Sequence, residues 1–178
     1  MTINQASTRD SLGVTRVADA FQPATLAHFA QRPSGAHLFR VQHERMAQLM
    51  RRVVVGSEGV LSGESVVDAR SALTTLTSLL SIHQSLEESL VHRSFAAEPR
   101  ARMIAEQFER EMVPLMAEMG SLARRYPTAS SILHGSKGEF TAAAGHLFAR
   151  FQERFRREER DLFPAFDRIT TGNLAVAA

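Results

Sequence analysis

The chain of 178 residues contains no cysteine, no tryptophan and a single tyrosine. The absence of cysteine excludes disulfides, thiol redox chemistry and thiolate metal ligands, so histidine and carboxylate side chains are the strong metal ligands that remain. With those ligands, a bound metal would be iron, manganese or zinc. The aromatic content comes almost entirely from eleven phenylalanines. We therefore expect a core that packs aliphatic side chains against phenylalanine rings.

The chain also lacks a strong charge of either sign and a long hydrophobic run. Its formal net charge is +2, and the arginines form no concentrated basic patch, so the sequence does not predict nucleic-acid binding. No apolar run approaches the length of a transmembrane helix, and the first residues show no basic start followed by an apolar stretch. We expect no membrane association and, by default, a cytoplasmic location.

The length fits one domain with a substantial core. Residues 1–33 are polar and aperiodic, and we expect an N-terminal extension there with at most one short helix around Ala24 to Phe29. Residues 34–170 are expected to form the helical domain, and residues 171–178 a C-terminal tail.

Four long segments carry apolar residues at alternating spacings of three and four, which is the pattern of amphipathic helices. The first runs from about Ser34 to Val55 and the second begins near Glu64. The third begins at Pro99, and the fourth at the capping-box sequence 136–139. The buried seam expected on the second helix is Ala69, Leu73, Leu76, Leu80, His83, Glu87 and Leu90. Without any strand pattern, these segments predict an all-α fold, an antiparallel up-down-up-down four-helix bundle.

Five polar or charged residues interrupt the apolar seams, namely His43, His83, Glu87, Arg154 and Glu158. A charge on a bundle seam is costly unless it is paired or binds a metal, so the five residues need a joint explanation. His83 and Glu87 stand one turn apart on one helix face, which lets an imidazole and a carboxylate reach the same ion. These residues therefore indicate either a metal site or a buried ion-pair network.

The motifs around these residues resemble those of the hemerythrin-like (HHE cation-binding) family. The matching stretches are Gln42-His43-Glu44, then His83 to Glu88, and the acidic pair Glu158-Glu159 followed by Arg160-Asp161-Leu162-Phe163-Pro164. Their order and spacing cover roughly His37 to Arg168. In that family the bundle holds two irons that two carboxylates bridge. The resemblance implies that His43 and His83 are terminal ligands of one iron and that Glu87 and Glu158 are the bridges.

The sequence departs from the family pattern at the second iron. The residue four positions before Glu158 is Arg154 instead of histidine, and the third helix contains no histidine. Gln107 or Glu111 is expected to stand at the third-helix position. A guanidinium brings positive charge and five donors into a pocket of carboxylates, so Arg154 can replace a cation there by salt bridges. We therefore expect a degenerate site that holds at most one iron, manganese or zinc ion, and no full diiron centre.

Two functions follow from this sequence. The first is a metal-binding or sensory bundle with an incomplete diiron site, in which one metal position is retained at His43, His83, Glu87 and Glu158. The alternative is a metal-free four-helix interaction domain in which Arg154 replaces the metal. An enzyme that uses the surviving metal for peroxide or oxygen chemistry stays open, but no nucleophile–base pair or glycine-rich phosphate loop supports it beyond the metal residues.

The remaining histidines and an apolar surface have simpler interpretations. The other histidines are expected on the solvated surface, and they are His28, His37, His92, His134 and His146. The second helix is apolar over more than one stripe because of Leu79, Ile82 and Leu86. This pattern fits a homodimer or protein partner, and it equally fits deep burial within the bundle.

Overall fold

The computed structural model describes residues 35–58, 63–135 and 137–176. The expected N-terminal extension with its short helix lies outside these residues, as do Ser34 and Ser136, where the first and fourth helices were expected to begin. Within the described residues the regular structure is helical throughout. None of these helices combines the length and the hydropathy that crossing a bilayer requires.

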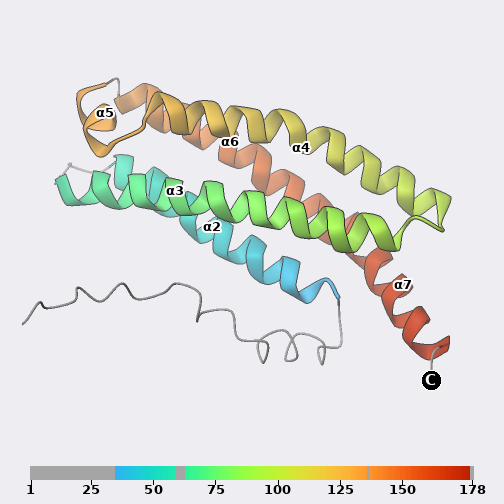
Figure 1. Ribbon diagram of the computed structural model, residues 1–178. Coiled ribbons are helices and arrows are strands. Elements are labelled where there is room, and N and C mark those ends of the chain that lie inside the picture. Colours follow the sequence, from blue (N-terminus) through green and yellow to red (C-terminus); the bar gives the residue numbers. More distant parts are fainter. Residues whose placement is uncertain (1–34, 59–62, 136, 177–178) are drawn as a thin grey trace, which may run out of the picture. The chain divides into compact units, whose positions relative to one another are not determined.

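Four helical rods make up the bundle (Figure 1). The first rod is α2 (His37–Glu58), and the second is α3 (Gly63–Leu86) continued by η2 (Glu87–His92). The third is α4 (Pro99–Arg125), which begins with its proline in the first turn, as predicted. The fourth joins α6 (Lys137–Arg157), η3 (Glu158–Leu162) and α7 (Phe163–Val176).

Successive rods run in opposite directions in Figure 1, and α2 and α4 each pack against both α3 and α6. This arrangement is compatible with the expected up-down-up-down bundle. The short helix α5 (Ala129–His134) lies in the connection between α4 and α6. It begins with a capping box formed by Thr128 and Ser131. At the other end of the chain, residues 171–176 continue α7, so the expectation of a tail from residue 171 was wrong.

The buried apolar residues form two separate clusters. One cluster surrounds Met46, Leu80 and Phe151, and the other surrounds Phe39, Val91 and Leu162. Each rod contributes to both clusters, and on three rods His43, the pair His83 and Glu87, and Glu158 stand between the two contributions in the sequence. A polar layer therefore divides the core of the bundle. We use "polar layer" for His43, His83, Glu87, Arg154 and Glu158, all of which are buried.

Two π-helical turns begin at the carboxylates of this layer, η2 at Glu87 and η3 at Glu158. A π turn accommodates one extra residue, because its hydrogen bonds span five residues instead of four. The second rod consequently buries Val91 and Phe95, whereas Leu90 is 45% exposed. The prediction that Leu90 continues the buried seam was wrong for this reason. Spacing rules for a regular α-helix do not anticipate the extra residue.

Candidate metal centre

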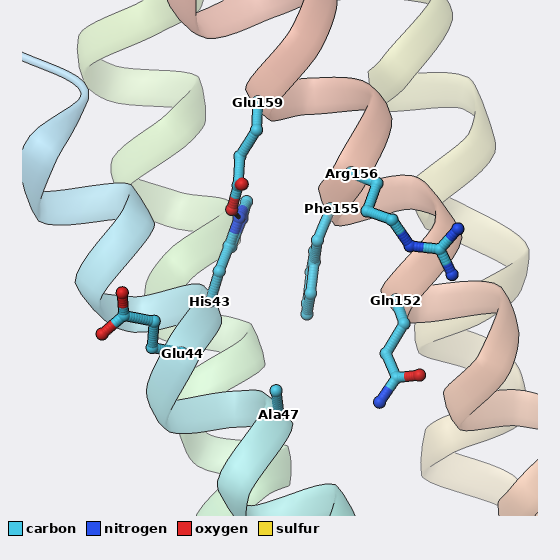
Figure 2. A pocket seen from close by; sticks show the side chains of 7 residues that line it. All are labelled: His43, Glu44, Ala47, Gln152, Phe155, Arg156 and Glu159. Carbon is cyan, nitrogen blue, oxygen red and sulfur yellow. Dashed lines mark hydrogen bonds and ion pairs between the residues drawn. The ribbon is translucent and has the colours of Figure 1, made fainter.

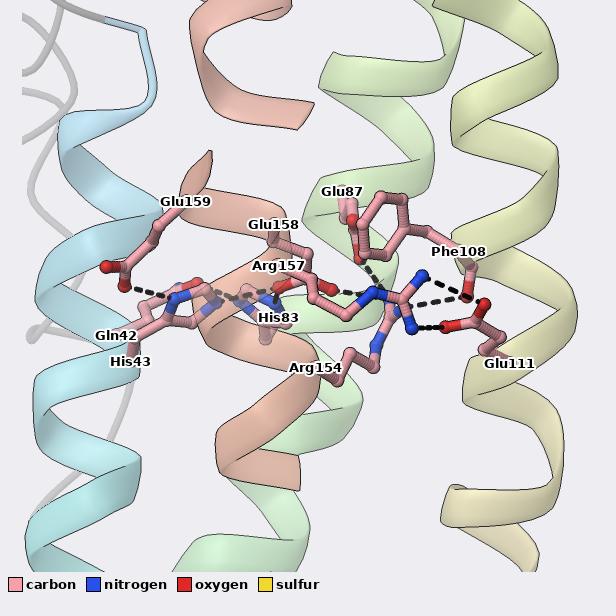
Figure 3. A network of polar contacts seen from close by, with 10 residues as sticks. All are labelled: Gln42, His43, His83, Glu87, Phe108, Glu111, Arg154, Arg157, Glu158 and Glu159. Atoms are coloured by element: carbon pink, nitrogen blue, oxygen red, sulfur yellow. Dashed lines mark hydrogen bonds and ion pairs between the residues drawn. The ribbon is translucent and has the colours of Figure 1, made fainter. Parts of the chain in front are cut away.

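The polar layer begins at α2, reaches α4 where Arg154 contacts Phe108, and brings together residues that are far apart in the sequence (Figure 3). His43 comes from α2, His83 from α3, and Arg154 from α6. Glu87 and Glu158 occupy the first positions of the two π turns. All five side chains sit at 4% exposure or less. The five residues singled out in the sequence thus form one contiguous group.

Each histidine is oriented by a hydrogen bond on its outer nitrogen. Nδ1 of His43 donates to Oε1 of Glu159 over 2.8 Å, and Nδ1 of His83 donates to Oε1 of Gln42 over 2.9 Å. Both acceptors are oxygens that cannot donate, so the proton of each neutral ring is on Nδ1. The inner nitrogen, Nε2, therefore carries a lone pair in both rings.

Both lone pairs face the same carboxylate oxygen. Oε2 of Glu158 lies 3.0 Å from Nε2 of His43 and 3.8 Å from Nε2 of His83. Neither Nε2 atom has a hydrogen-bond partner within the described residues, and the same holds for Oε2 of Glu158. Buried acceptors that face one another need a cation between them, either a proton or a metal ion.

One ligand atom from each of His43, His83 and Glu158 lies within 4.8 Å of the other two. Two imidazole nitrogens and a carboxylate oxygen are a donor set that suits iron, manganese or zinc. The outer hydrogen bonds to Gln42 and Glu159 are those expected around metal-binding imidazoles. The residues present therefore fit a single ion.

Arg154 occupies the other half of the layer. Its Nη2 lies 2.6 Å from Oε1 of Glu158 and 3.2 Å from Oε2 of Glu87, and its Nη1 donates to the carbonyl oxygen of Phe108 over 2.7 Å. The guanidinium carbon lies 5.3 Å from the centre of the Phe108 ring, within the range of a cation–π contact. Glu158 therefore faces the histidines with one oxygen and the guanidinium with the other.

Glu87 stands apart from the three converging residues. Its Oε2 accepts from Arg154, and it is not part of the group of ligand atoms that share one position. Its role as a fourth ligand stays a prediction. The structure brings it to the guanidinium of Arg154, as the salt-bridge alternative requires.

Burial and neighbouring charges shift the pKa values of the two carboxyl groups of the layer in opposite directions. Burial, together with the nearby charge of Glu158, raises the pKa of Glu87 to about 8. Burial also acts to raise the pKa of Glu158, but hydrogen bonds with the His43 and His83 rings, which require a proton on the inner nitrogen, and the charge of Arg154 outweigh it and hold that pKa at about 2. Burial lowers the pKa of His83, which disfavours an imidazolium at this position. Glu158 thus stays ionised at neutral pH, while Glu87 largely retains its proton.

The third-helix residues predicted for this layer lie at its rim. Glu111 accepts two hydrogen bonds from Arg157, over 2.8 and 3.1 Å, and a third from Nε2 of Gln107 over 3.1 Å. The residue that α4 buries beside the guanidinium is Phe108. Glu111 therefore forms a salt bridge, but with Arg157 and not with Arg154.

No role at the site was expected from the sequence for Gln42, Glu159 or Arg157. The first two flank the predicted ligands directly, and this adjacency is the signal that points to them. Among the other histidines, the solvated location holds for His37, His134 and His146, while His28 lies outside the described residues. It was wrong for His92, whose side chain is 19% exposed and approaches Glu109 at 3.7 Å.

Aromatic rings enclose the histidine side of the layer. The ring of His43 stacks on Phe155, with 4.2 Å between centroids and 14° between planes. Phe39 meets the ring of His83 edge-on at 5.6 Å. These contacts hold both imidazoles in one orientation and keep the local dielectric low, which strengthens every charge interaction in the layer.

A pocket of about 260 Å³ opens beside His43, between α2 and the α6–η3 segment (Figure 2). Its lining residues are His43, Glu44, Ala47, Gln152, Phe155, Arg156 and Glu159. His43 is 4% exposed, whereas His83 and Glu158 are fully buried. The pocket thus connects the surface of the bundle with the edge of the group formed by His43, His83 and Glu158.

Comparison with known proteins gives one match. No curated protein and no solved structure matches this chain. A model of the hemerythrin HHE cation binding domain matches residues 34–166, which is most of the chain and includes the whole polar layer. With the helical bundle and the buried histidine–carboxylate group, this match shows that the chain belongs to the hemerythrin HHE cation-binding domain family.

Proposed function

We propose that this protein is a hemerythrin-like bundle that holds a single metal ion between His43, His83 and Glu158. One observation carries the proposal: two imidazole lone pairs and a carboxylate oxygen face one another in the core without a hydrogen-bond partner. A buried arrangement of this kind is costly unless a cation is shared among the three atoms. Burial lowers the pKa of His83, so this ring does not readily supply a shared proton.

The contacts of Arg154 support the binding of one ion instead of two. Its guanidinium contacts both Glu87 and Glu158, the carboxylates that would bridge two irons. A permanent positive charge on those oxygens opposes a second cation. The family's second metal position is thereby replaced by a side chain of the protein.

The bound ion would act as a Lewis acid with coordination positions left open to a small ligand, because the protein supplies three converging ligands. The pocket beside His43 offers such a ligand a path through the surface of the bundle. A sensory role for a small molecule such as oxygen or nitric oxide is therefore part of the proposal, and it rests on the family.

Metal titration of the purified protein tests the proposal. Anaerobic loading with ferrous iron, or loading with zinc, is expected to reach one ion per chain by elemental analysis. His83→Leu should lose stoichiometric binding, because it replaces a ligand by a side chain of similar size that cannot bind a metal ion. His146→Leu is the matched control, since His146 is exposed on α6. Two irons per chain with an oxo-bridge absorption band would show that the centre is complete and the proposal wrong.

The alternative function is a metal-free interaction domain. It draws on the contacts of Arg154, which supply the buried carboxylates with a counter-charge from the protein itself. If the protein takes up no stoichiometric metal under any loading condition, this alternative replaces the first proposal.

The expected partner and location stay predictions. On the second rod, Leu79 and Leu86 pack partly buried against the core clusters, while Ile82 is 53% exposed. This placement leaves a homodimer or another protein partner as an expectation, along with the cytoplasmic location.

A further inference from the structure

We propose that Arg154 determines which ions the site accepts, by making it selective for divalent over trivalent ions. This inference rests on the proposed single-ion site at His43, His83 and Glu158. The proposed function concerns how many ions the site binds. This inference concerns the charge of the ion that the site retains.

The guanidinium is a fixed part of the site. Three contacts hold it: the ion pairs with Glu158 at 2.6 Å and with Glu87 at 3.2 Å, and the hydrogen bond to the carbonyl of Phe108 at 2.7 Å. Its side chain is 3% exposed, so water does not screen its charge. An arginine side chain keeps its charge at every pH at which the protein is folded. The site therefore contains one permanent positive charge.

The ion and the guanidinium share a carboxylate. Oε2 of Glu158 faces the two imidazoles, while Oε1 faces Nη2 of Arg154. The negative charge that would neutralise a metal ion is thus already partly neutralised from the other side. Since the two histidines contribute no charge when they act as ligands, the ion receives less compensation than a carboxylate-rich site provides.

This arrangement penalises each added charge on the ion. Coulomb repulsion between the guanidinium and the ion grows in proportion to the ion's charge. At an effective dielectric constant of about 20, one additional charge a carboxylate's width away changes the binding constant by tenfold or more. The same penalty favours the ferrous over the ferric form of bound iron.

A neighbouring arginine provides the matched control. Arg157 lies one turn from Arg154 on the same helix, but it pairs with Glu111, and both side chains are about one-third exposed, at 30% and 33%. Its charge is compensated by its own partner and screened by solvent. Removing it should therefore leave the discrimination between ions unchanged.

The test is a competition between two redox-inert ions, Zn²⁺ and Ga³⁺, each buffered with a chelator of known affinity. We measure the ratio of their binding constants in the wild type and in three variants. Arg154→Gln should shift the ratio toward Ga³⁺ by at least about tenfold. Arg154→Lys keeps the charge and should retain the wild-type ratio, as should Arg157→Gln. Circular dichroism verifies that each variant is folded.

If Arg154→Gln does not fold, Glu87→Gln combined with Arg154→Gln replaces both side chains by neutral amides and leaves no unpartnered Glu87. The ratio is expected to shift in the same direction, because the guanidinium is the member of the pair that contacts Glu158. An unchanged ratio in the folded glutamine variant would overturn the inference while leaving the single-ion site intact. An equal shift in Arg157→Gln would also overturn it. If the wild type binds neither ion, the inference falls together with the proposed function.

Discussion

Replacing Arg154 by methionine removes the guanidinium from the polar layer while keeping an unbranched side chain in its place. The wild-type guanidinium contacts Glu158, Glu87 and the carbonyl oxygen of Phe108 within the core. Removing one partner of a buried ion pair destabilises a protein by about 3–5 kcal/mol, because the other charge stays buried without compensation. A buried carbonyl that loses its donor adds about 1–3 kcal/mol.

These contributions are not additive here, because the two carboxyl groups differ in protonation. The pKa of Glu87 is raised to about 8, so at pH 7 this group already carries a proton in the native state. Removing the guanidinium therefore mainly leaves Glu158 without its counter-charge, because the pKa of Glu158 is held at about 2 and this group is ionised. We expect Arg154→Met to lower the free energy of unfolding of the metal-free protein by about 3–5 kcal/mol in total.

Urea unfolding at pH 7 with a chelator present, followed by far-ultraviolet circular dichroism, measures this loss. The control is Arg157→Met, which breaks a partly exposed pair with Glu111 and should cost no more than about 1 kcal/mol. Excess Zn²⁺ is expected to raise the urea midpoint of Arg154→Met, because an ion bound to Glu158 restores a counter-charge. If the two methionine variants lose the same stability, Arg154 is not the internal counter-ion of the layer.

Two further predictions concern access to the site and its missing half. Ala47→Leu fills the pocket beside His43 and should slow metal uptake several-fold in stopped-flow experiments without changing the final stoichiometry, whereas Ala149→Leu, in a neighbouring hollow, should do neither. An unchanged uptake rate would mean that ions enter by another route. Arg154→His combined with Phe108→His supplies imidazoles where the guanidinium and its aromatic neighbour lie, and should raise iron uptake above one per chain. Uptake that stays at one would show that the lost half-site has been assigned to the wrong residues.

Much of the fold was predictable because helical periodicity is a local property. Spacings of three and four identify the residues that one helix face buries, and the structure buries Leu73, Leu76 and Leu80 as those spacings require. The prediction failed at Leu90 because a π turn changes the number of residues per turn. The spacing of apolar residues before Glu87 does not indicate that a π turn follows. The helix that continues to Val176 was missed for another reason, since a weak pattern at a chain end resembles a tail.

The candidate site was also predictable from the sequence only in part. The sequence by itself determined that His43, His83, Glu87, Arg154 and Glu158 are buried together, because each interrupts an apolar seam at a defined point along its helix. It also predicted that the second metal position of the family is lost, because arginine stands where the family has histidine and the third helix has no histidine.

Only the tertiary structure decided how these residues pair. Arg154 meets Glu87 across 67 positions of the chain, and His83 is oriented by Gln42 across 41. The choice of Arg157 and not Arg154 as the partner of Glu111 depends on how α6 is rotated against α4. Such pairings depend on distances between helices, which the packing of both core clusters determines and which no spacing along one helix contains.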